Sequence, residues 1–81
     1  MGYAVNKRTP EQRASAAQII ATHGAAGYRS AAILVGFNEA SGMLAVYIAT
    51  KAQMSPSDPD VADAVGEIRV RAGLGRTPQE H

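Results

Sequence analysis

The sequence predicts an α+β domain with the order (β)αββα, in which an antiparallel hairpin is covered on one face by two helices. Three observations lead to this fold class. The stretch between Arg29 and Lys51 is strongly apolar and contains a turn-like segment near its middle. A capped helical pattern lies on each side of it. The chain has 81 residues and no cysteine, so one small domain without disulfide support is expected.

The first helix is predicted to begin after Thr9 and to stop near Gly24. Thr9 offers an N-cap hydroxyl, Pro10 suits the first helical position, and Gln12 completes a capping box. The apolar residues that follow are mostly alanine, and glycine commonly ends a helix. The small side chains of such a helix allow its backbone to approach a partner surface closely.

The hairpin is predicted from two strands, residues 30–37 and 43–50, joined by a turn at residues 38–42 that ends in glycine. Side-chain alternation leaves both faces of this hairpin apolar, whereas an antiparallel sheet usually has one polar face. Two helices cover only one face, so the other is expected to be an exposed apolar interface. The residues predicted for that interface are Leu34, Met43, Ala45 and Tyr47.

The second helix has two candidate starts, at Ser55/Pro56 and at Asp58/Pro59, and a fitting stop at Gly73. Its apolar residues recur at helical spacing. However, the segment that begins at Glu67 also alternates like a strand, and Gly66 weakens a helix. Residues 67–72 therefore stay open between helix and strand.

The domain boundaries follow from these elements. Residues 9–74 are expected to form a single domain. Residues 1–8 are expected to be an N-terminal arm or a short strand, and residues 75–81 a flexible tail.

Charge and composition argue against several functional classes. Eight Lys and Arg residues stand against seven Asp and Glu residues, without the basic excess typical of nucleic-acid-binding proteins. Two histidines and no cysteine give no recognisable ligand set, so no metal and no cofactor is expected. The N-terminus lacks the regions of a secretory signal, and the apolar runs are too short to cross a bilayer. A cytoplasmic protein without membrane contact is expected.

The sequence contains no catalytic motif, so the protein is not expected to be an enzyme. His23 is interpreted as a residue favoured near the C-terminus of a helix, and the aspartates at 58, 60 and 63 as residues favoured near the start of one. The glycines at 24 and 27 follow a helix rather than a strand, which argues against a phosphate-binding loop.

Two clusters of charge are candidate binding sites. At one end of the hairpin, pairing would bring together a possible anion-binding set, namely His23, Tyr28, Arg29 and Lys51. The favoured interpretation of Arg29 and Lys51 is nevertheless that they are charges that terminate two apolar strands. At the opposite end, a possible nucleic-acid-binding set gathers from both helices, namely Lys7, Arg8, Arg13, Arg69, Arg71 and Arg76.

The leading hypothesis is a non-enzymatic interaction module that forms a homodimer through the uncovered hairpin face or through a hairpin edge. It would bind another protein and modulate or inhibit it, as small accessory or inhibitor proteins of phages and mobile elements do. The first alternative is a nucleic-acid-binding protein that uses the basic end. The second alternative is a protein that binds a small anionic ligand or a nucleotide.

Overall fold

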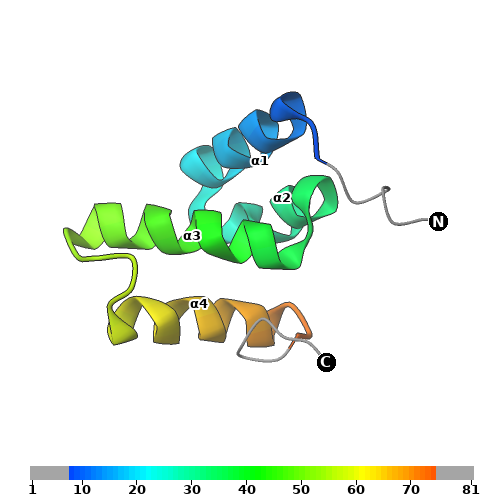
Figure 1. Ribbon diagram of the computed structural model, residues 1–81. Helices are drawn as coiled ribbons and strands as arrows, with labels where there is room; N and C mark the ends of the chain where they lie inside the picture. Colours follow the sequence, from blue (N-terminus) through cyan, green and yellow to red (C-terminus); the bar gives the residue numbers. More distant parts are fainter. Residues whose placement is uncertain (1–7, 75–81) are drawn as a thin grey trace.

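The computed structural model describes residues 8–74, and the secondary structure within that range is entirely helical (Figure 1). The elements in chain order are α1 (Pro10–His23), the 3₁₀ helix η2 (Gly24–Gly27), α2 (Tyr28–Val35), α3 (Phe37–Ala52) and α4 (Pro59–Arg71). Helix α3 crosses the middle of the molecule, with α1 on one side and α4 on the other (Figure 1). The predicted α+β class is therefore wrong, because residues 8–74 contain no strand. The expectations for residues 1–7 and 75–81 lie outside the described residues.

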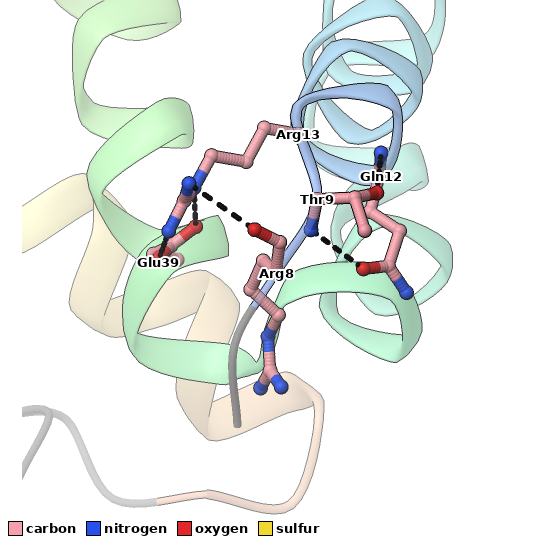
Figure 2. A network of polar contacts seen from close by, with 5 residues as sticks. All are labelled: Arg8, Thr9, Gln12, Arg13 and Glu39. Carbon is pink, nitrogen blue, oxygen red and sulfur yellow. Dashed lines mark hydrogen bonds and ion pairs between the residues drawn. The ribbon is translucent and has the colours of Figure 1, made fainter. Parts of the chain in front are cut away.

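The prediction for the first helix is confirmed. The Oγ1 atom of Thr9 accepts a hydrogen bond from the backbone N–H of Gln12 at 3.1 Å, and Gln12 Oε1 accepts one from the N–H of Thr9 at 2.9 Å (Figure 2). This reciprocal pair satisfies two N–H groups that the start of a helix leaves without partners. Helix α1 ends at His23, and its C-cap is Gly24, whose φ of +61° is favourable for glycine.

The predicted hairpin is instead two helices joined by one residue. Residues 30–37 lie mostly in α2, and residues 43–50 lie in α3 together with the predicted turn at 38–42. The chain breaks at Gly36, with φ +90° and ψ +156°, a conformation that is essentially restricted to glycine. The buried residues of these two helices recur at helical rather than strand spacing: Tyr28, Ala31, Ala32 and Val35 in α2, and Ala40, Ser41, Leu44 and Ala49 in α3.

This change also removes the reason to expect a second copy of the chain. A homodimer was expected because a hairpin with two apolar faces needs cover on both. Helices α2 and α3 instead each bury an apolar face in the core of a single chain. Residues 8–74 contain no strand, so the exposed strand face that was expected to form the homodimer is not present among them. Nothing in the described residues supports the homodimer.

The second predicted helix is α4, and it begins at the later of its two candidate starts. The carboxylate of Asp58 accepts a hydrogen bond from the N–H of Asp60 at 2.8 Å, and Pro59 is the first helical residue. The start at Ser55/Pro56 is therefore wrong. The strand alternative for residues 67–72 is also wrong, because α4 continues through Arg71.

A buried polar cluster joins α4 to α2 and α3. The side chain of Arg69 is only 5% exposed, and its Nη1 donates to Tyr28 Oη at 2.9 Å and to Ser41 Oγ at 2.7 Å. The two hydroxyl groups are also 2.8 Å from each other, and Ser41 Oγ donates to the carbonyl of Phe37 at 2.7 Å. Since buried polar groups are costly without hydrogen bonds, this cluster fixes how α4 sits on the other helices.

Candidate functional site

An open apolar groove lies between α1 and α3. Its volume is about 370 Å³. The residues that line it are Ala17, Ile20 and Ala21 from α1, and Met43, Val46, Tyr47 and Thr50 from α3. Apart from the hydroxyl groups of Tyr47 and Thr50, these side chains are hydrocarbon or thioether. The groove is therefore suited to apolar groups rather than to charged ones.

The helical repeat explains why these residues share one groove. Positions 43, 46, 47 and 50 have the spacing that places side chains on one face of α3, and positions 17, 20 and 21 do the same on α1. The side chains of Ala17 and Ala21 are too small to fill the space between the two helices, and both residues remain exposed. Ile20 is buried, whereas Val46 is 54% exposed although it is apolar.

Tyr47 lies near the end of the groove at which α1 ends and η2 begins. A Cβ atom built at Gly24 would lie 3.1 Å from both Cε2 and Oη of Tyr47, so the aromatic ring packs closely on the glycine backbone. The Nζ atom of Lys51 lies 5.7 Å from the centroid of the same ring, which is the geometry of a cation–π contact. The ring is thus held between a glycine and a lysine.

An ion pair joins the two helices at the other end of the groove, near their N-termini (Figure 2). Arg13 Nε donates to Glu39 Oε1 and Arg13 Nη2 donates to Glu39 Oε2, both at 3.2 Å. Arg13 Nη1 also donates to the carbonyl of Arg8 at 3.4 Å. Because Arg13 contacts Glu39 near the start of both helices and Gly24 packs on Tyr47 further along, α1 and α3 run roughly parallel.

The ion pair shifts the pKa values of both partners. The hydrogen bond from Arg13 lowers the pKa of Glu39 below its ordinary 4.5, against a smaller opposing effect of desolvation. The hydrogen bond to Glu39 raises the pKa of Arg13 above its ordinary value. Both side chains are about half exposed, so solvent weakens their attraction.

The lowered pKa of Glu39 predicts how the ion pair contributes to stability across the pH range. The contribution is fully present above the pKa of the unfolded chain and is lost as pH falls through the lower pKa of the folded protein. Acid denaturation of Glu39→Gln, followed by circular dichroism, is expected to show a shallower loss of stability below pH 4.5 than the wild type. Glu11→Gln, which leaves the ion pair intact, is the control. Equal acid sensitivity of Glu39→Gln and the wild type would contradict the prediction.

Of the four residues predicted for the interface, Met43 and Tyr47 line the groove. All four are partly buried against the core, and Ala45 and Leu34 do not line the groove. Strand alternation grouped residues 43, 45 and 47, whereas the helix groups 43, 46, 47 and 50. Sequence reasoning thus missed Val46 and Thr50, whose helical spacing from Met43 was the available signal. It also missed Ala17, Ile20 and Ala21 of α1, because their place in the groove depends on how α1 packs against α3.

The four residues of the predicted anion-binding set belong to three different helices. The hydroxyl group of Tyr28 lies in the core, and Arg29 donates to the carbonyl of Ala72 at 2.8 Å. His23 is exposed at the end of α1, and Lys51 lies over Tyr47 at the end of α3. The hairpin end that was expected to bring Arg29 beside Lys51 does not form, because these residues belong to two helices.

The predicted nucleic-acid-binding set includes one buried arginine and one paired arginine. Arg69 is buried in the polar cluster, and Arg13 is paired with Glu39. Arg8 is partly buried near the start of α1, whereas Arg71 is exposed at the end of α4. Lys7 and Arg76 lie outside the described residues. The burial of Arg69 removes a central member of this set from contact with a phosphate backbone.

Neither the described residues nor comparisons with known proteins point to a known activity. Among residues 8–74, no group of three or more His, Asp or Glu side chains is placed to hold a metal ion. Within the same range, no helix has the length and apolar character needed to cross a membrane. The chain matches no protein-family model, no curated protein and no solved structure. Nothing therefore supports the expected inhibitory role or phage origin.

Proposed function

We propose that this protein is a non-enzymatic binding module that accepts an apolar helix of a partner protein in the groove between α1 and α3. The observation that carries the proposal is the groove itself, an apolar cavity of about 370 Å³ in which Val46 is 54% exposed. Grooves of this kind bind amphipathic helices through a few apolar side chains at helical spacing.

The dimensions of the groove suit a short helical segment. On α3 its lining extends from Met43 to Thr50, which corresponds to about 10 Å at a rise of 1.5 Å per residue. A partner helix would present about two turns along this length, with apolar residues at spacings of three and four. The alanines of α1 permit close approach of the partner backbone.

The placement of charge supports a protein partner over a nucleic acid. The charged side chains nearest the groove are at its ends, where Arg13 is paired with Glu39 and Lys51 lies over Tyr47. The lining residues between them are uncharged. A nucleic acid would need a row of accessible cations, and the buried Arg69 is not available to it.

The substitution Val46→Asp tests the proposal. A carboxylate in the apolar groove is expected to weaken partner binding at least about 30-fold, because a charge without a partner is costly there. Since Val46 is 54% exposed, the fold should be retained, which circular dichroism checks. The partner is first isolated by affinity capture from the producing cells, and its dissociation constant is then measured by calorimetry with the purified proteins.

Val70→Asp is the matched control, because Val70 is 47% exposed and lies on α4, away from the groove. It is expected to bind the partner like the wild type. Equal binding by Val46→Asp and Val70→Asp would overturn the assignment of the groove. Sedimentation velocity of the purified chain distinguishes a second copy from a different protein as the occupant.

A further inference from the structure

A second cavity, of about 330 Å³, lies where η2 and the start of α2 meet the end of α4. Its apolar lining includes Ala25 and Ala26 of η2 together with Ile68 and Ala72 from α4 and its C-cap. Tyr28 also lines it, from the buried first position of α2. None of these residues belongs to the groove between α1 and α3. The cavity is therefore a separate feature of the molecule.

Two arginines from different helices line this cavity. Arg29 comes from α2, and Arg71 is the last residue of α4. Arg29 Nη1 donates to the carbonyl of Ala72 at 2.8 Å, which fixes this side chain across the gap between the helices. One such bond leaves the other N–H groups of the guanidinium available. Neither arginine forms an ion pair with a carboxylate among residues 8–74.

The bond from Arg29 to Ala72 has a simple structural role, since it caps the C-terminal end of α4. Arg71 is an exposed second cation at the same cavity, in the last turn of α4, where the helix dipole also favours a positive charge. Two arginines of like charge beside one cavity repel each other, and a bound anion would relieve this repulsion. An arginine that is already held in place also loses less entropy when it binds a ligand.

We propose that this cavity binds a small amphipathic carboxylate, whose acid group contacts Arg29 and Arg71 and whose hydrocarbon body lies on the alanines and Ile68. Arginine suits a carboxylate because its N–H groups match the two oxygens. The volume is at the lower end of the range for small-molecule sites, which suits a compact ligand. Inorganic phosphate would leave the apolar lining uncovered, and Tyr28 is the only aromatic lining residue, so stacking of a nucleotide base is not favoured. This proposal does not depend on the function proposed for the groove.

Titration with 4-phenylbutyrate, followed by ¹H–¹⁵N NMR, tests the site. Saturable shifts are expected at the amides of Ala25, Ala26, Ile68 and Ala72. Arg71→Gln is expected to weaken binding about tenfold, the loss that corresponds to one charge-assisted hydrogen bond. Lys51→Gln, which removes an exposed cation outside the cavity, is the matched control and should bind like the wild type.

Two further probes define the chemistry. The uncharged 4-phenylbutanol is expected to bind about tenfold more weakly than the acid, and inorganic phosphate is expected to cause no saturable shift at the same amides. Arg29→Gln provides a second variant and should also weaken binding of the acid. The proposal is overturned if 4-phenylbutyrate shifts the groove residues instead, if Arg71→Gln binds like Lys51→Gln, or if phosphate binds as tightly as the acid.

Discussion

Replacing Arg69 with alanine is expected to lower the free energy of unfolding by about 2–4 kcal/mol. The side chain is 5% exposed and donates to the hydroxyl groups of Tyr28 and Ser41. Its removal deletes two hydrogen bonds that join α4 to α2 and α3, and it leaves a cavity in the core. Urea denaturation followed by circular dichroism measures the loss. A domain of this size has little stability in reserve, so partial unfolding at 25 °C is an expected consequence.

Arg71→Ala is the control, because it removes the same residue type from the same helix at an exposed position. Its effect is expected to stay within about 0.5 kcal/mol. Tyr28→Phe removes only a hydroxyl group from the cluster and should cost about 1–2 kcal/mol. Because Tyr28 and Arg69 are in direct contact, their double variant should lose less than the sum of the two single losses. Equal effects of Arg69→Ala and Arg71→Ala would contradict the role assigned to the cluster.

The substitution Gly36→Ala is expected to destabilise the protein by about 2–3 kcal/mol. Gly36 is the single residue between α2 and α3, and its φ of +90° with ψ of +156° is strained for a residue with a side chain. A Cβ atom there would also lie 2.8 Å from Nη2 of Arg8, which would have to move. The midpoint of urea denaturation reports this loss, and the slope of the transition should be unchanged.

Gly42→Ala is the matched control for this substitution. Gly42 lies inside α3 and is exposed, and a Cβ atom built there would point into open space. Alanine is favoured over glycine in a helix interior, so this variant should gain about 0.5–1 kcal/mol. The two glycine substitutions are therefore expected to change the free energy of unfolding in opposite directions. If Gly36→Ala also stabilised the protein, the backbone geometry assigned to the junction would be incorrect.

The two glycines also explain where the sequence-based fold prediction failed. Gly42 was interpreted as the end of a hairpin turn, although it lies within α3, whereas the real break is at Gly36. Local rules do not distinguish these cases, because a short apolar run fits a buried strand and a buried helix almost equally well. Glu39 lies in the first turn of α3, where an acidic residue favours a helix start, but the same residue also fits a polar turn between two strands. By contrast, α1 was predicted correctly because its capping signals are local in sequence.

The candidate site was predictable only in part, and for a related reason. Met43 and Tyr47 were selected as interface residues because they are apolar and were expected to be uncovered. Their neighbours from α1, Ala17 and Ala21, depend on the packing of α1 against α3, which no local pattern reports. The burial of Arg69 could not be predicted from the sequence either, because its partners Tyr28 and Ser41 are 41 and 28 residues away in the chain.

The size of the side chains at positions 17 and 21 of α1 affects both the stability of the domain and the space in the groove. Larger apolar side chains at Ala17 or Ala21 would fill the groove, bury more hydrocarbon and make the isolated domain more stable. The same change would occupy the space that we propose for a partner helix. Because natural proteins are rarely at their stability optimum, Ala17 and Ala21 leave room for stabilising substitutions, and here such substitutions would be expected to weaken the proposed binding.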